Sequence, residues 1–277
     1  MIASGAQTHP AVWTAAALLA ATLGARAFEQ MNVFRPQKEI YAHPGTYGLK
    51  YEDVWLTADD GARVNAWWVP LPGEGPVVLY FHGNGGNIGT RLDMVKRLRE
   101  AGASVLLFDY RGYGRSPGTP TEAGTYRDGE AAYAWLVAEK RVEPRKIFFL
   151  GESLGNGVAL ELALRHAPAG LIFQSGFTSI VDMGRVVFPF LPAQFMTRYR
   201  YDNIAKIGKL RCPLLVMHSP QDEVIPFAMG RRVFDAAPEP KAFFALTGRH
   251  NDGFMLTGGA YVQALRSFFA SISAARI

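Results

Sequence analysis

The chain has 277 residues, of which 49% are hydrophobic and 19% are charged, so it can bury the core of one large domain and is not disordered. Its net charge is +5, but the basic residues are scattered and form no recognisable module, which argues against a nucleic-acid partner. The single cysteine, Cys212, excludes an internal disulfide and a cysteine-based metal site, and we expect a small buried side chain there.

The first 31 residues differ in composition from the rest of the chain. The stretch from Ala11 to Ala27 is apolar until Arg26, but it is short and rich in alanine. A membrane anchor, a signal segment and a helix packed on the domain or on a partner all stay open. Ala25-Arg26-Ala27 resembles a signal-peptidase site, yet residues 1–10 contain no Lys or Arg. We expect an apolar helix or anchor over 1–31, with membrane association favoured over a cytoplasmic location, and a folded domain over 32–277.

The folded domain begins with a predicted β-hairpin. The segments Tyr51–Thr57 and Arg63–Val69 flank Ala58-Asp59-Asp60-Gly61, and an Asp-Gly pair between two strand-like segments is typical of a hairpin turn. The next segment, Pro76–Phe81, is a continuous apolar run, which predicts a strand buried on both faces.

Strands then alternate with helices, which favours right-handed crossovers and a mainly parallel sheet of about eight strands with helices on both faces. Ligands of such sheets bind at the carboxyl ends of the strands. The further expected strands are Ser104–Asp109, Lys146–Leu150, Gly170–Gln174, Pro213–His218 and Lys241–Leu246, and the expected helices include Ile88–Ala101, Thr121–Lys140 and Ala260–Ala274.

The most informative motif is Gly151-Glu152-Ser153-Leu154-Gly155, which lies between an apolar strand and a predicted helix. This context is typical of a nucleophile elbow, in which a strained turn presents the serine hydroxyl above the sheet. Gly151 and Gly155 lack the Cβ atoms that would collide where strand and helix approach. Ser153 is therefore the candidate nucleophile.

A serine nucleophile needs a base, which an acid orients in turn. Asp222 follows a predicted strand and His250 follows the last one, so the chain order is Ser, Asp, His, as in α/β-hydrolases. Asp222 could instead cap the next helix, and Glu223 could be the acid if the loop is shifted by one residue. His82 and His218 also lie at strand ends and are the competing bases.

An acyl-transfer intermediate also needs two N–H donors for its oxyanion. We expect the backbone amides of Leu154 and of Asn84, the latter in the loop His82-Gly83-Asn84-Gly85-Gly86. The Lys and the spacing of a nucleotide-binding loop are absent, so we expect no cofactor. No His, Asp or Glu pair has metal-ligand spacing, so we expect no metal. Asp109 and Arg111 are interpreted as a buried pair that holds a loop.

These motifs resemble those of the α/β-hydrolase superfamily, and within it the branch of depalmitoylase-like and serine-aminopeptidase-like hydrolases. The resemblance implies an α/β-hydrolase fold, a triad of Ser153, Asp222 and His250, and Asn84 and Leu154 as oxyanion donors. Two positions depart from the family pattern: Asn156, where glycine is common, and Arg249, where a small residue is common. The matching stretches are Phe81–Gly89, Asp109–Gly118, Gly151–Gly155, Gly176–Ser179, His218–Pro226 and His250–Asp252.

A short insertion between 178 and 209 contains the apolar run from Val186 to Met196, which we interpret as a small lid, with ordinary helix packing as the alternative. We expect a serine hydrolase that cleaves small or lipid-like carboxylic esters or thioesters. A peptidase or amidase of the serine-aminopeptidase type, and an inactive hydrolase-fold scaffold at a membrane, are the alternatives. The candidate substrate-pocket residues are Phe177, Phe188, Phe190, Phe195 and Met196.

Overall fold

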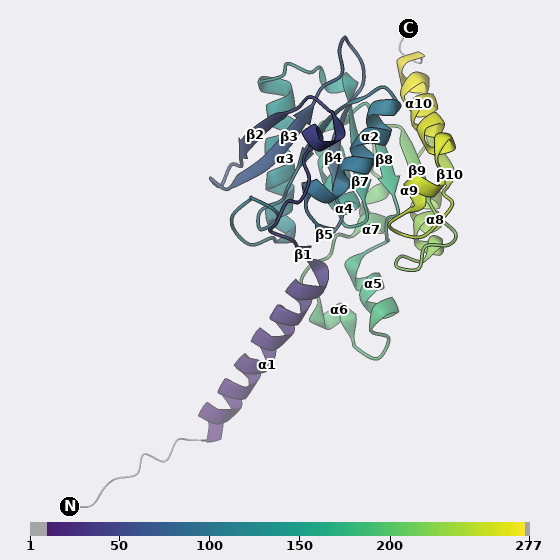
Figure 1. Cartoon of the computed structure of the whole chain (residues 1–277). Coiled ribbons are helices and arrows are strands. Elements are labelled where there is room, and N and C mark those ends of the chain that lie inside the picture. The colour runs from purple at the N-terminus through teal and green to yellow at the C-terminus, as the bar shows by residue number, and fades with distance from the viewer. Residues whose placement is uncertain (1–9, 275–277) are drawn as a thin grey trace, which may run out of the picture.

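The computed structural model describes residues 10–274, without the side chains of 10–21, 195–196 and 273–274. Its centre is an eight-stranded sheet with the order β10-β9-β8-β7-β4-β6-β3-β2 (Figure 1). Strand β3 runs antiparallel to β2 and β6, whereas the other neighbours are parallel. The predicted mainly parallel sheet and its leading hairpin are therefore confirmed. The strands are β2 (Glu52–Thr57), β3 (Arg63–Val69), β4 (Val77–Phe81), β6 (Ser104–Phe108), β7 (Ile147–Glu152), β8 (Gly170–Gln174), β9 (Leu214–His218) and β10 (Lys241–Ala245).

Helices cover both faces of this sheet, as the unbroken apolar runs predict. In β4, Val77, Leu79 and Phe81 belong to one buried cluster, and Val78 and Tyr80 belong to the other. Burial of each large apolar side chain contributes about 1.5–3 kcal/mol, so both faces stabilise the fold. Helices α3 (Glu122–Ala138), α4 (Gly155–His166), α7 (Asn203–Ile207) and α8 (Phe227–Ala236) supply the first cluster, and α2 (Leu92–Glu100) and α10 (Gly259–Ala274) supply the second. Shorter helices are η1 (Pro44–Tyr47), η2 (Ile88–Arg91), η3 (Pro144–Lys146) and α9 (Gly253–Leu256).

The N-terminal helix α1 (Pro10–Val33) leaves the body of the molecule, but its last turns are part of it (Figure 1). It meets the insertion of residues 178–209, which contains α5 (Ile180–Val187) and α6 (Ala193–Met196) and is named the lid from here on. The buried Glu29 carboxylate accepts the backbone N–H groups of Arg198 and Tyr199, at 2.6 and 2.9 Å. The rings of Phe28 and Phe188 lie 5.2 Å apart. The boundary expected after residue 31 thus falls inside a continuous helix whose end is docked on the lid.

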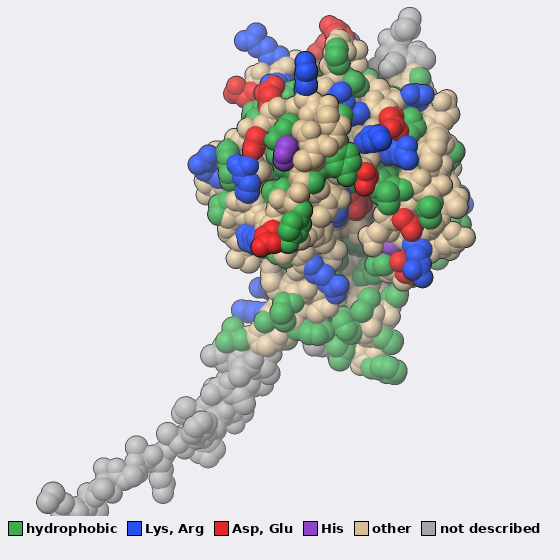
Figure 2. Space-filling view, viewed as in Figure 1, with side chains coloured by type: hydrophobic (Ala, Val, Ile, Leu, Met, Phe, Trp, Pro, Cys, Tyr) green, Lys and Arg blue, Asp and Glu red, His purple; other side chains and the backbone are tan. Residues whose placement is uncertain are grey.

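Figure 2 shows hydrophobic side chains gathered over the lid and the adjoining end of α1. None of the helices in the described part of the chain is long and apolar enough to cross a bilayer. The sequence suggested an anchor at residues 11–27, and the side chains of 11–21 lie outside the described ones.

A two-stranded bridge links the segment after α1 to the loop that follows β4. Strand β1 (Arg35–Pro36) pairs in parallel with β5 (Gly85–Gly86). The amide of Arg35 donates to the carbonyl of Asn84 at 2.9 Å, and that of Gln37 donates to Gly86 at 3.0 Å. The loop expected to carry an oxyanion donor is therefore held by residues about 50 positions earlier in the chain.

The junction between β7 and α4 is as crowded as the glycine pattern predicts. A Cβ atom on Gly155 would lie 2.0 Å from the carbonyl oxygen of Phe81, and one on Gly151 would lie 2.5 Å from the Cα of Asn156. Both contacts are with backbone atoms, which cannot move aside without shifting the strand or the helix.

We therefore predict that Gly155→Ala lowers the free energy of unfolding by about 3 kcal/mol, because the added methyl group overpacks the junction. Urea denaturation measures this loss. Gly259→Ala is the matched control, since a Cβ there meets no atom within 4 Å. Equal stability of the two variants would show that the junction is looser than described.

Candidate active site

Ser153 lies at the turn from β7 into α4 with a left-handed backbone, φ 52°. Such a conformation is strained for a residue with a side chain and persists only where neighbouring contacts hold it. Here the Ser153 amide donates to the carbonyl of Gln174 at 3.0 Å. The buried Asn156 amide side chain donates to the same carbonyl at 2.7 Å and to that of Ser153 at 3.0 Å. The asparagine that departs from the family pattern thus ties the turn to β8.

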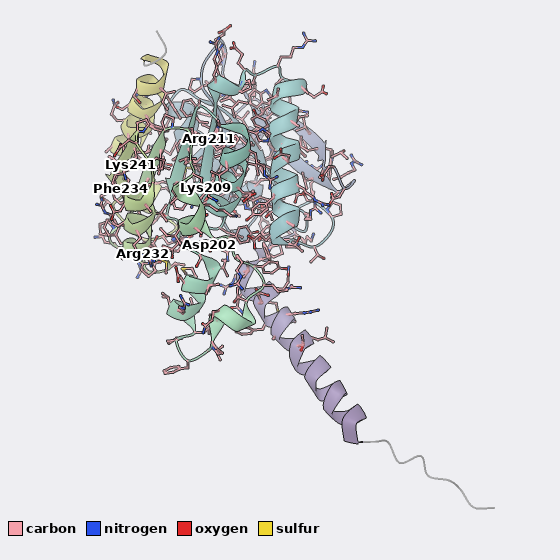
Figure 3. The ribbon with its side chains drawn as sticks, turned by 180° about the vertical axis from the view of Figure 1, so that it is seen from behind. Asp202, Lys209, Arg211, Arg232, Phe234 and Lys241 are labelled. Carbon is pink, nitrogen blue, oxygen red and sulfur yellow. The ribbon has the colours of Figure 1, made fainter. Side chains whose placement is uncertain are left out.

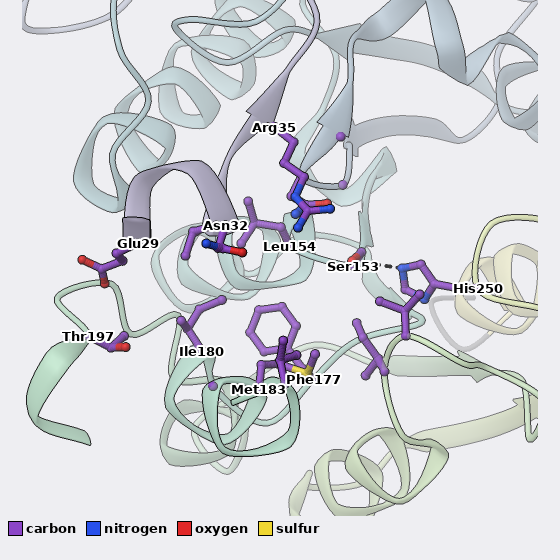
Figure 4. Close-up of a pocket in the computed structure, with 18 of the residues that line it drawn as sticks. Glu29, Asn32, Arg35, Ser153, Leu154, Phe177, Ile180, Met183, Thr197 and His250 are labelled. Carbon is purple, nitrogen blue, oxygen red and sulfur yellow. Dashed lines mark hydrogen bonds between the residues drawn. The ribbon is translucent and has the colours of Figure 1, made fainter. Parts of the chain in front are cut away.

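The structure brings Ser153, Asp222 and His250 together from three loops at the carboxyl edge of the sheet. His250 Nε2 lies 3.2 Å from Ser153 Oγ (Figure 4). His250 Nδ1 lies 2.8 Å from Asp222 Oδ2. A neutral imidazole that donates its Nδ1–H to the carboxylate leaves a lone pair on Nε2 to accept the serine hydroxyl. The predicted residues therefore have the spacing and order of a nucleophile, a base and an orienting acid.

Asp222 is saturated with hydrogen-bond donors. Its Oδ1 accepts the backbone N–H groups of Val224 and Ile225, at 2.9 and 2.8 Å. Its Oδ2 lies 3.2 Å from Nε2 of His218 and 2.8 Å from the His250 ring, and both carboxylate and His218 side chains are fully buried. Burial alone would raise the pKa of Asp222, but the hydrogen bonds from His218 and His250 outweigh it and hold that pKa well below its usual range.

The alternative acid, Glu223, and the alternative bases, His82 and His218, make contacts other than those of a triad. Glu223 accepts the backbone amide of His250 at 3.0 Å, whereas the ring of His250 contacts Asp222 and Ser153. His82 is buried, with Nδ1 2.7 Å from the carbonyl of Gly83 and Nε2 3.4 Å from Asp109. His218 contacts Asp222 rather than Ser153. The sequence analysis did not predict the contact between His218 and Asp222. The position of His218 at a strand end, four residues before Asp222, could have indicated it.

The prediction that Asp109 and Arg111 pair with each other is wrong. Asp109 accepts the amide of Ile88 at 2.9 Å and lies beside His82, whereas Arg111 binds Asp128 and Asp60, each at 2.7 Å. Asp109 and Arg111 lie two positions apart in the irregular segment that follows β6, where the side-chain alternation of a strand does not apply, and each side chain meets a different partner. Both still hold loops in place.

The two expected oxyanion amides lie next to Ser153 in space or in sequence. Neither the Leu154 amide nor the Asn84 amide donates to an acceptor within the described residues. The Asn84 loop is held from several sides: its carbonyl accepts the Tyr113 hydroxyl at 2.7 Å, and Arg91 donates to Gly85 at 2.9 Å. A Cβ on Gly83 would lie 3.3 Å from the Cβ of Ser153, so this loop closely approaches the serine.

A cavity of about 580 Å³ opens beside Ser153 and His250, between α1 and the lid. Two of the candidate pocket residues, Phe177 and Phe188, line it. Phe190 does not: it lies on the turn between α5 and α6 with 96% of its surface exposed, because this turn projects beyond the cavity wall. The side chains of Phe195 and Met196 lie outside the described ones. Lining residues that the sequence did not indicate come from α1, β1 and α5: Phe28, Asn32, Val33, Arg35, Ile180, Met183 and Val187.

Other reactive side chains are accounted for within the described part of the chain. No group of three or more His, Cys, Asp or Glu residues there is placed to hold a metal ion. Burial raises the pKa of the Cys212 thiol to about 12, so this cysteine stays protonated at neutral pH. It also lies outside the residues that line the cavity.

Comparisons with known proteins agree with this architecture. Residues 74–201 match the family model described as "Serine aminopeptidase, S33". The chain is 31% identical to the alpha/beta hydrolase domain-containing protein WAV2 of Arabidopsis thaliana over 85% of each chain. It is 31% identical to the lysophosphatidylserine lipase ABHD12 of Danio rerio, over 76% of this chain and 63% of that one. The solved esterase Pf2001 of Pyrococcus furiosus superposes with a TM-score of 0.72 at 17% identity, covering 86% of this chain and 98% of that chain.

The saturated carboxylate of Asp222 predicts a pH-dependent contribution to stability. Because its folded-state pKa is depressed, this contribution is present above the unfolded pKa of about 4 and is lost as the pH falls further. We predict that Asp222→Asn lowers the free energy of unfolding most near neutral pH, since the new NH₂ group faces N–H donors. The deficit relative to the unmodified protein should shrink below about pH 4.

Urea denaturation between about pH 7 and pH 3 measures the free energy of unfolding of the unmodified protein and of Asp222→Asn. Asp59→Asn is the control, because that carboxylate is 76% exposed and its one ion pair among the described residues is with the half-exposed Arg127. A deficit of Asp222→Asn that stays constant over the whole pH range would contradict the prediction.

Proposed function

The chain belongs to the α/β-hydrolase superfamily, and we propose that it is a serine hydrolase that cleaves carboxylic esters or thioesters through an acyl-enzyme. The observation that carries this proposal is the continuous hydrogen-bonded series from Ser153 Oγ through the His250 ring to Asp222, with distances of 3.2 and 2.8 Å. Each residue has the contact that its role requires, and the serine faces a cavity large enough for a substrate.

In the proposed mechanism His250 Nε2 takes the proton of Ser153 as its Oγ attacks the substrate carbonyl carbon. The negative charge moves to the carbonyl oxygen, where the amides of Leu154 and Asn84 would donate to it. The bond to the leaving group then breaks, and His250 returns the proton to the departing alkoxide or thiolate. Water repeats the sequence on the acyl-enzyme, which releases the acid and frees Ser153.

Asp222 keeps the His250 ring in the orientation that presents Nε2 to Ser153 and stabilises the imidazolium that forms. It can do so at neutral pH because its donors hold it ionised. The residues around it therefore contribute to the chemistry without touching the substrate.

Esters and thioesters are favoured over peptides by the charges that line the cavity. A peptidase that removes N-terminal residues needs a carboxylate to bind the substrate ammonium group. The two carboxylates on the cavity wall are already paired: Glu152 with Arg91 at 3.0 Å, and Glu29 with the amides of Arg198 and Tyr199. The apolar side chains of α1 and α5 suit an acyl chain instead. The lipase among the relatives supports the same class of substrate.

The central test is covalent labelling with a serine-reactive fluorophosphonate. We expect the unmodified protein to be labelled and Ser153→Ala to be unlabelled, because only the activated serine attacks phosphorus. Ser267→Ala is the matched control, since this exposed serine lies on α10 away from the cavity, and it should be labelled fully. Equal labelling of all three proteins, or of none, would refute the assignment of Ser153.

Substrate class is tested with acyl esters of increasing chain length, an acyl thioester and an aminoacyl amide. Turnover of the esters or the thioester above that of the amide supports the proposal. Dominant turnover of the amide would favour the peptidase alternative. A protein that neither turns over any of these substrates nor is labelled would favour the inactive scaffold.

We further propose that His218 positions Asp222. Its Nε2 faces both Asp222 and the carbonyl of Ile225, at 3.2 and 3.1 Å, so the proton of a neutral ring lies on Nε2. We predict that His218→Leu lowers kcat about 10-fold or more, because a hydrogen bond to a charged group is lost. KM should change little, since His218 does not line the cavity.

His218→Gln keeps an N–H donor at the same reach and should restore part of kcat. Steady-state kinetics separate kcat from KM, and urea denaturation checks that both variants are folded. Equal kcat values for the Leu and Gln variants would show that the donor itself is not what matters.

A further inference from the structure

The charged side chains on the cavity wall are not all paired with one another. Apart from His250, the charged residues that line it are Glu29, Arg35, Arg91 and Glu152. Arg91 and Glu152 form an ion pair at 3.0 Å, with 16% and 17% of their side chains exposed. Glu29 Oε2 lies 3.4 Å from Nε of Arg198, which lies outside the cavity lining. Among the described residues, the guanidinium of Arg35 has no carboxylate partner.

Arg35 is placed by its backbone rather than by its side chain. Arg35 is the first residue of β1. Its backbone N–H donates to the carbonyl of Asn84, and it is paired with Gly85 in the register of β1 and β5. Asn84 and Gly85 belong to the loop of residues 82–86, which lies against Ser153 and carries the proposed oxyanion donor. The cation is therefore attached to the same rigid frame as the reacting atoms, which is the arrangement that gives a binding group precision.

The cavity is divided into an apolar side and a polar side. Figure 4 shows Arg35 directed from β1 toward Ser153, whereas Phe177, Ile180 and Met183 lie on the opposite side of the cavity. A substrate carbonyl held at Ser153 would thus have one arm along apolar side chains and the other arm near the guanidinium. Desolvation of the apolar arm and charge pairing of the polar arm act on different parts of one molecule.

We infer that Arg35 selects substrates by charge: the preferred substrates are esters or thioesters with an apolar acyl chain and a leaving group that carries a carboxylate or a phosphate. The inference rests on the proposed serine-hydrolase function and adds the chemistry of the leaving group. A carboxylate and a phosphate each present two oxygen atoms that a guanidinium can bind through two parallel N–H bonds.

The size of the effect follows from exposure. Arg35 is exposed at the mouth of the cavity, so its pairing with an anion is partly screened by water and salt. A charge-assisted bidentate contact is stronger than an ordinary exposed ion pair, so we expect a preference of about 3- to 10-fold in kcat/KM, which corresponds to about 0.7–1.4 kcal/mol. The preference should fall as the ionic strength rises.

The test uses three octanoyl thioesters that differ only in their leaving group: neutral 2-mercaptoethanol, 3-mercaptopropionate and 2-mercaptoethyl phosphate. The readout is the ratio of kcat/KM for each anionic substrate to that for the neutral one, measured on the full chain at low and high salt. The unmodified protein should give ratios of about 3 to 10 at low salt. Arg35→Ala should bring the ratios close to one, Arg35→Glu should bring them below one, and Arg35→Lys should retain part of the preference.

Arg211→Ala is the matched control. This exposed arginine has no partner among the described residues and precedes β9, at the amino end of the sheet, on the face seen from behind (Figure 3). It should leave the ratios unchanged. Because each ratio is taken within one variant, a general loss of activity in an Arg35 variant does not alter the comparison.

Ratios near one in the unmodified protein, or equal ratios with Arg35→Ala, would overturn the inference while turnover of the neutral thioester leaves the proposed function standing. Failure of fluorophosphonate labelling and of all thioester turnover would instead remove both. A preference for only one of the two anions, lost in Arg35→Ala, would narrow the leaving group to a carboxylate or to a phosphate.

Discussion

The close approach of α4 to the end of β4 is the constraint on which the rest of the site depends. At Gly155 the helix backbone comes so near the Phe81 carbonyl that no Cβ fits between them. The turn before the helix is consequently short, and Ser153 takes a left-handed conformation that raises its hydroxyl above the sheet. The strain is held by hydrogen bonds from Ser153 and Asn156 to the carbonyl of Gln174 on β8. Sheet, helix and turn therefore determine one position for the nucleophile.

The N-terminal segment contributes to the same site, although it precedes the sheet in sequence. Strand β1 holds the loop of the proposed oxyanion donor, and the last turns of α1 form a wall of the cavity against the lid. Glu29 caps two amides of the lid segment, and Phe28 packs on Phe188. A displacement of α1 would thus change the cavity and the loop together.

The sequence predicted those parts of the molecule whose signal is local. The hairpin, the buried strands and the elbow each depend on a short pattern of apolar residues and glycines, and the structure has them within a residue or two. The ordered loops with Asp222 and His250 were found because each follows a strand. Contacts between distant segments were not predictable: nothing in Arg35-Pro36 alone indicates a pairing with Gly85-Gly86. Phe190 was misplaced because an apolar run does not tell which side chains of a short, irregular lid face inward.

The same distinction explains why the reaction is easier to infer than the substrate. The proposed chemistry needs a serine, a histidine and an aspartate at strand ends, and the parallel sheet brings strand ends together in any member of the fold. Substrate preference depends on which charges along the cavity are already neutralised. Glu152 has Arg91 and Glu29 has two amides, so neither presents a free carboxylate to a ligand. Arg35 differs from them only through the absence of a partner within the described residues, a property that exists only once the chain is folded.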